Sequence, residues 1–215
     1  MAAATVNWSA KTYNGLTDAS GVALPTGNLL EIGTFLNGTT PLTDAQIQTA
    51  FNNGTLSNFF KLFGSGTIGG LAPGYFSLQS NGFTDSVGIS GRQIYILAFN
   101  SGSVGTATQE GIFYLNAATS GKSTWLFPSD SANPSLTGVD LADLTGAASG
   151  AGSNNLITGA DVVIGAFGPA TLSPTAGIQN AKAFELAPIP TPEPASAGLA
   201  LLGGVALLIR RRRSA

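Results

Sequence analysis

Short hydrophobic runs alternate with turns rich in Gly, Ser, Asn and Thr from residue 5 to about residue 187. This alternation over a few residues at a time is typical of a β-rich domain. The candidate strands cover residues 5–8, 29–35, 75–79, 93–100, 111–115, 123–127, 161–167 and 182–186. The pattern predicts a mainly β fold, either a β-sandwich or a jelly-roll-like domain.

Two candidate strands, 93–99 and 161–167, carry apolar residues on both of their alternating faces. A strand with two apolar faces is usually covered on both sides. We therefore expect both segments to be central strands.

One region has helical rather than strand-like spacing. Residues 43–46 read Thr-Asp-Ala-Gln, the sequence of a capping box, and apolar residues follow at helical intervals. A second apolar set at positions i, i+3, i+4 and i+7 comprises Leu56, Phe59, Phe60 and Phe63, ahead of Gly64. These features predict a small helical hairpin insertion over about 43–64, with its aromatic stripe packed onto the sheet.

The composition excludes many kinds of chemistry. The 215 residues include no His and no Cys, and only 9% are charged, against about 25% in a typical protein. Disulfides, thiolate or imidazole metal sites and His-dependent catalytic pairs are therefore excluded. Residues 64–69 match G-x-G-x-x-G but follow a helical pattern, so we interpret them as a Gly-rich linker and expect no nucleotide cofactor.

The charges are unevenly distributed. Arg210, Arg211, Arg212 and Arg213 are four of the nine basic residues, whereas the preceding body holds ten of the eleven acidic ones. Nucleic-acid binding needs clustered basic side chains on the folded domain, so we expect no nucleic-acid partner. An acidic body of this kind suits a protein kept soluble outside a cell.

The composition changes after residue 187. Proline occupies every second position from Pro188 to Pro194, which predicts a stiff extended spacer. Residues 195–209 are free of charge, and as a helix they would extend about 22 Å against a hydrocarbon core of about 30 Å. Local bilayer thinning and snorkelling of the terminal arginines could close that gap. We expect a single transmembrane helix with the arginines in the cytoplasm and the body outside.

Pro192-Glu193-Pro194, the short apolar segment and the four arginines follow one another in an order that resembles the PEP-CTERM sorting signal of exported bacterial proteins. The resemblance covers about the last 24 residues. It implies that a membrane-embedded exosortase recognises Pro192, Glu193 and Pro194 and cleaves nearby. It also implies that 195–209 is a transient anchor and that the arginines stop transfer. Residues 93–100 and 125–130 resemble uncharacterised exported proteins with the same tail, a resemblance that implies no activity.

Export also requires an N-terminal signal peptide. Ala2, Ala3 and Ala4 resemble the small-residue end of a cleavage site, so we interpret residues 1–4 as a remnant of that region and expect the mature protein to begin near Thr5. The predicted organisation is then an extracellular domain (5–187), a spacer (188–194), a transmembrane helix (195–209) and a basic cytoplasmic tail (210–215). We expect residence in the bacterial inner membrane during export, followed by the cell surface or the extracellular medium.

Two functions remain open. The first is a non-enzymatic surface or biofilm-matrix protein, with no cofactor, no metal, no catalytic residues, and extracellular polysaccharide as a candidate partner. The alternative is a secreted carbohydrate-binding module or a carboxylate-based carbohydrate-active enzyme that uses Asp, Glu, Trp8 and Trp125. Glu31, Glu110 and Glu185 each lie on or beside a candidate strand, and we interpret them as solvated strand positions rather than as a catalytic pair. Exposed tryptophans beside two carboxylates would favour the alternative, and buried tryptophans the first function. A weaker candidate is a calcium site formed by Asp130, Asp140, Asp143 and Asp161 with Asn133 and Asn154.

Overall fold

The computed structural model describes residues 3–10, 14–69, 72–116, 123–130, 136–145, 156–171 and 182–191. Its elements in chain order are β1 (Ala4–Ala10), β2 (Leu16–Thr17), β3 (Leu29–Asn37), β4 (Thr40–Pro41), α1 (Asp44–Asn52), the 3-10 helix η1 (Leu56–Asn58), β5 (Phe60–Thr67), β6 (Phe76–Gly82), β7 (Tyr95–Phe99), η2 (Val104–Thr106), β8 (Gln109–Leu115), β9 (Leu136–Asp140), η3 (Leu141–Thr145), β10 (Ala160–Ile164), β11 (Ala166–Thr171), β12 (Lys182–Glu185) and β13 (Ala187–Pro188). The predicted mainly β fold is confirmed.

The largest sheet has the strand order β10-β8-β7-β3-β4, with β5 also paired to β3 and β13 to β8. Strand β7 lies in the middle of this order, and all of its residues are buried. The prediction of a central strand in 93–99 is therefore confirmed. Two smaller sheets have the orders β6-β1-β9 and β11-β12-β2.

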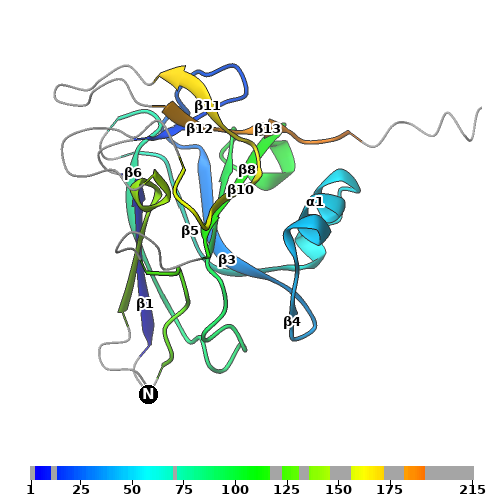
Figure 1. The fold of residues 1–215 in the computed structure, drawn as a ribbon, viewed down its shortest axis with the longest axis vertical. Helices are drawn as coiled ribbons and strands as arrows, with labels where there is room; N and C mark the ends of the chain where they lie inside the picture. Colours follow the sequence, from blue (N-terminus) through cyan, green and yellow to red (C-terminus); the bar gives the residue numbers. More distant parts are fainter. Residues whose placement is uncertain are drawn as a thin grey trace, which may run out of the picture.

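Aromatic side chains pack both within and between the sheets in one core. Trp8 of β1 packs edge-on against Phe76 of β6, with ring centroids 5.6 Å apart. Phe113 of β8 packs in the same way against Phe184 of β12 at 5.2 Å. Strands β1 and β6 lie on one side of β3 and β5, and α1 lies on the other (Figure 1). The sheet that contains β3, β7 and β8 is thus covered on both faces.

The prediction of one central strand over 161–167 is wrong. Strand β10 pairs with β8 at the end of the main strand order, whereas β11 pairs with β12 in a different sheet. Gly165 separates them with a φ of +103°, and a Cβ at this position would collide with the main-chain oxygen of Glu185. Because glycine tolerates both the positive φ and the close approach, the chain changes sheet at this residue.

The first half of the predicted helical hairpin is confirmed as α1. The Thr43 N–H donates to Gln46 Oε1 at 2.9 Å, and the Gln46 N–H donates to Thr43 Oγ1 at 3.4 Å, which completes the capping box. The apolar face of α1 is buried through Ile47, Ala50 and Phe51.

The second half of the hairpin is wrong, because a single 3-10 turn, η1, is followed by β5, which runs antiparallel to β3. Pairing with β3 satisfies the main-chain groups of this segment, and its glycines fit a strand that approaches β6 closely. A Cβ at Gly64 would collide with Ser80 Oγ, and one at Gly66 would lie 2.6 Å from Leu78 Cδ1. The interpretation of 64–69 as a linker is therefore also wrong for residues 64–67.

The strand expected over residues 123–127 is not formed. They contribute an isolated bridge between Leu126 and Gln93, supported by a hydrogen bond of 2.8 Å from the Ile94 N–H to the Trp125 oxygen. Strand β9, which pairs in parallel with β1, was not expected from the sequence.

The last described residues lie on the edge of the main sheet. Strand β13 is antiparallel to β8, and the Ile189 N–H donates to the Thr108 oxygen at 2.8 Å. Residues 192–215, which include the tripeptide 192–194, the expected transmembrane helix 195–209 and the four arginines, lie outside the described residues. Among the described residues, no helix combines the length and the apolar character needed to span a membrane.

Candidate functional site

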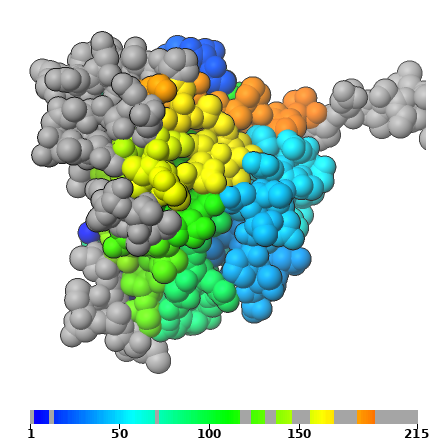
Figure 2. Space-filling model, in the orientation of Figure 1, coloured from blue at the N-terminus to red at the C-terminus, as the bar shows by residue number. Residues whose placement is uncertain are grey.

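A cavity of about 470 Å³ lies between the main sheet and the segment formed by α1 and η1. Its size falls in the range of small-molecule sites. Most of its wall is apolar and includes Phe51 of α1, Leu97 and Phe99 of β7, and Ile189 beyond β13. Figure 2 shows the last described residues, in orange, beside the cyan surface of α1 and η1. Residues of α1, of η1 and of the segment after β13 therefore line the same cavity.

Two carboxyl groups, those of Glu31 and Glu110, line this cavity. Their convergence follows from strand register, because Glu31 of β3 pairs with Leu97 of β7, and Phe99 of β7 pairs with Glu110 of β8. Residues two apart on a strand share a face, so both glutamates point to the same side of the sheet with one strand between them.

Glu110 is deeply buried in this wall. Its side chain is 6% exposed, and among the described residues none forms a hydrogen bond with its carboxyl group. Burial and, to a smaller extent, the charge of Glu31 raise the pKa of Glu110 from 4.5 to about 8. Burial also raises the pKa of Glu31, which is half-buried. At neutral pH the raised pKa keeps the Glu110 carboxyl group largely protonated, beside the Glu31 carboxyl group, whose pKa burial also raises.

No Lys or Arg belongs to the described lining of the cavity. Two basic side chains of the described part have other contacts: Arg92 donates to the Thr39 oxygen at 3.1 Å, and the Lys182 ammonium lies 5.9 Å from the centre of the Phe167 ring. The described lining therefore offers no cationic side chain to either glutamate.

A second carboxyl pair lies farther along the same face of the sheet. Tyr114 of β8 donates a hydrogen bond of 2.7 Å to Asp44 Oδ2 in the first turn of α1. Asp161 of β10 pairs with Tyr114 in the sheet and lies close enough to Asp44 for the two carboxyl groups to interact. Burial, followed by the charge of Asp44, raises the pKa of Asp161. This cluster fixes the start of α1 to the sheet, and Phe51 at the other end of α1 reaches the cavity.

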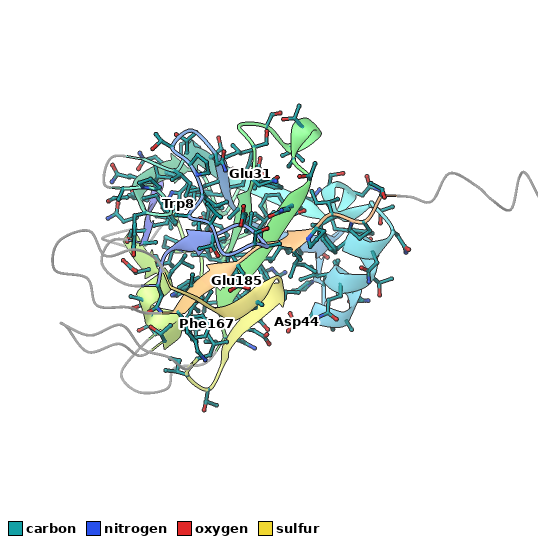
Figure 3. All side chains as sticks on the ribbon, turned by 90° about the horizontal axis from the view of Figure 1, so that it is seen from above. Trp8, Glu31, Asp44, Phe167 and Glu185 are labelled. Atoms are coloured by element: carbon teal, nitrogen blue, oxygen red, sulfur yellow. The ribbon has the colours of Figure 1, made fainter. Side chains whose placement is uncertain are left out.

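Sequence reasoning missed the cluster of Asp44, Tyr114 and Asp161. Asp44 appeared only as part of a capping box, and no signal in the sequence paired it with β8 or β10. The interpretation of Glu110 as a solvated strand position is wrong, because Glu110 is buried, and the structure directs it and half-buried Glu31 to one cavity. The third candidate, Glu185, lies on β12 next to β11 and Phe167, away from Glu31 (Figure 3).

Both tryptophans are buried, each with 1% of its surface exposed. Trp8 Nε1 donates to Ser80 Oγ at 3.1 Å. Neither ring therefore offers a flat surface on which a sugar could stack. Exposed tryptophans, the feature expected of the carbohydrate-binding alternative, are therefore not found at Trp8 or Trp125.

The carboxylates considered for calcium serve other contacts. Asp130 Oδ1 accepts hydrogen bonds from the Thr84 N–H at 2.8 Å and from its hydroxyl at 2.9 Å. Asp140 Oδ1 accepts from the Ala142 N–H at 2.9 Å, at the start of η3. Asn133 and Asn154 lie outside the described residues. Within the described ranges, no three acidic side chains are grouped as metal ligands would be.

Comparison of the chain with protein-family models, with curated proteins and with solved structures finds no match.

Proposed function

We propose that this chain is an exported bacterial protein of the cell surface or extracellular matrix, and that its body has a non-enzymatic structural or adhesive role. The observation that carries the proposal is the order of Pro192-Glu193-Pro194, the uncharged segment 195–209 and Arg210 to Arg213. An exosortase-type enzyme would read the tripeptide while 195–209 anchors the chain transiently in the membrane. The partners of the mature body would then lie outside the cell, with polysaccharide as a candidate.

The body supports this role through its composition and packing. It has no His and no Cys, and its two tryptophans are buried in the core. We infer a β-sandwich-like or jelly-roll-like arrangement, supported by the packing of Phe113 in the main sheet against Phe184 in a smaller sheet.

The proposal is tested in the native host with point variants of the tail. Pro192→Ala and Glu193→Ala change the tripeptide, whereas Pro190→Ala changes the spacer just outside it. We expect mass spectrometry of the extracellular wild-type and Pro190→Ala proteins to find termini that lack the arginine cluster. The two tripeptide variants should instead stay in the membrane fraction with residues 210–213 attached. Secretion of wild-type protein that still carries these arginines would overturn the proposal, as would unchanged surface display after deletion of 192–215.

The alternative of a carbohydrate-active enzyme is favoured by one observation: Glu31 and Glu110 face one cavity, and the pKa of Glu110 is raised to about 8. Glycoside hydrolysis requires one carboxyl group that stays protonated to act as the acid, and the raised pKa of Glu110 suits that role. Against it, the cavity wall is largely apolar, whereas a sugar needs many hydrogen-bond partners. Hydrolysis of aryl glycosides by the wild type, lost in Glu110→Gln and in Glu31→Gln but retained in Glu185→Gln, would establish the alternative. The absence of turnover from pH 5 to pH 8 would dismiss it.

A further inference from the structure

We propose that the cavity between the main sheet and the α1–η1 segment binds an apolar amine, with the hydrocarbon part against the aromatic wall and the ammonium group at Glu110. This inference concerns the folded body and is independent of the proposed sorting of the chain. It rests on the shape of the cavity, on the state of Glu110 and on the distribution of charge around it.

The hydrocarbon part is indicated by the cavity wall and its surroundings. Phe51, Phe60 and Phe99 contribute aromatic surface to a volume of about 470 Å³. Leu62 and Val104 also line it, yet they remain 55% and 47% exposed. Large apolar side chains that stay this exposed beside a cavity mark a surface suited to an apolar ligand.

The polar part is indicated by Glu110. The residue is only 6% exposed, and its carboxyl group has no hydrogen-bond partner among the described residues. The Glu110 oxygens are not among the fully buried side-chain atoms that lack a partner in the described residues, so they are accessible from the cavity. Because Glu110 lines the cavity, a ligand there can supply the missing partner.

The sign of the ligand charge follows from the neighbours of Glu110. Glu31 is the only other titratable side chain in the described lining, and it is also acidic. An anionic ligand would be repelled by Glu31, whereas an ammonium group is attracted to both carboxyl groups. A sugar is disfavoured because Ser57 provides the only hydroxyl group of the described lining. An apolar body with a single positive charge therefore fits this wall best.

Binding is coupled to a proton. An ammonium ligand favours the ionised form of Glu110, so the carboxyl proton leaves Glu110 and passes to the solvent while the ammonium keeps its own protons. No covalent bond forms or breaks in the ligand. At pH 7, association should release close to one proton for each amine bound.

The test uses the full chain and three probes of similar size, 2-phenylethylamine, 2-phenylethanol and 3-phenylpropionate, in titration calorimetry at pH 7. We expect the amine to bind at least 10-fold more tightly than the alcohol, and the carboxylate to bind most weakly. Titrations in buffers of different ionisation enthalpy should show proton release with the amine only. Glu110→Gln should lose at least 10-fold of the amine affinity and keep the affinity for the alcohol.

Glu185→Gln removes a carboxylate outside the cavity and is the matched control, expected to bind all three probes as the wild type does. Ala107→Phe places a larger side chain in the cavity wall and should weaken both the amine and the alcohol. Amine binding that is equally tight in Glu110→Gln and in the wild type would overturn the proposal. Equal affinity for the amine and the carboxylate, or no binding of the amine, would overturn it as well.

Discussion

Tyr114 and Asp44 join the main sheet to the only α-helix of the described residues, through a hydrogen bond of 2.7 Å from the phenol to Asp44 Oδ2. A second contact runs from Gln48 Nε2 to the Val163 oxygen at 3.3 Å. Both contacts hold α1 against the face of the sheet that carries the cavity. The position of Phe51 in the cavity wall therefore depends on them.

Removal of the Tyr114 hydroxyl should destabilise the fold. Tyr114→Phe keeps the ring packed against Tyr95 but leaves the Asp44 carboxyl without this donor. We expect a loss of about 1.5–3 kcal/mol in the free energy of unfolding, as for hydrogen bonds to charged groups. Urea denaturation measures this change. Tyr95→Phe is the control, because the Tyr95 hydroxyl has no hydrogen bond to a described residue, and a loss equal to that of Tyr114→Phe would contradict the assignment.

Stability should fall as the pH rises through the range in which Glu110 titrates. Burial and the charge of Glu31 raise the pKa of Glu110 from 4.5 to about 8 in the folded state. A carboxyl group whose pKa is higher in the folded state contributes its full stabilisation below the unfolded-state pKa. This contribution to the free energy of unfolding is lost as the pH rises through the folded-state pKa. Glu110→Gln should remove most of this decline. At pH 8 its free energy of unfolding should exceed that of the wild type by on the order of 3 kcal/mol.

Denaturation curves collected from pH 4 to pH 9 test this expectation. Glu31→Gln provides a comparison, since Glu31 is only half-buried and should contribute a smaller decline of the same sign. If the pH dependence of Glu110→Gln matched that of the wild type, Glu110 would not be the group responsible.

The close approach of β5 to β6 predicts an intolerance to side chains at Gly64. The added methyl of Gly64→Ala would displace Ser80, whose Oγ accepts the hydrogen bond from buried Trp8 at 3.1 Å. We expect a destabilisation of about 1–3 kcal/mol from overpacking, with a shift in tryptophan fluorescence. Gly138→Ala in β9 is the matched control, because a Cβ there meets nothing within 4 Å. Equal stability of the two variants would argue against the close packing of β5 and β6.

The capping box of α1 should contribute measurably to stability. Thr43→Ala removes the oxygen that accepts the Gln46 N–H, and it should cost about 1 kcal/mol in thermal or urea denaturation. Thr43→Ser keeps a hydroxyl cap and should behave as the wild type. A Thr43→Ser variant as unstable as Thr43→Ala would show that the methyl group, rather than the cap, matters.

Local signals explain which elements could be predicted. The capping box at Thr43 and the double-sided apolar strand β7 are properties of short segments, and the structure has both. The segment from Leu56 to Phe63 satisfied a helical spacing, yet it forms η1 and the start of β5. Over so few residues, periodicity does not distinguish a helix from a strand that pairs with a distant partner.

The candidate site could be predicted only in part for a related reason. Glu31 and Glu110 were visible as isolated acids on candidate strands. Their common cavity depends on two long-range registers, Glu31 with Leu97 and Phe99 with Glu110, and a single sequence does not define these. The change of sheet at Gly165 depends likewise on the passing backbone of Glu185.

Ile189 belongs both to the cavity wall and to the segment that continues from β13 towards Pro192. A molecule seated in the cavity would touch the residue at which the polypeptide leaves the sheet. If a bound ligand stabilises the pairing of Ile189 with β8, then by thermodynamic linkage that pairing increases the affinity for the ligand by the same free energy. Detachment of β13 and Ile189 from β8 would therefore lower the affinity of the cavity for its ligand.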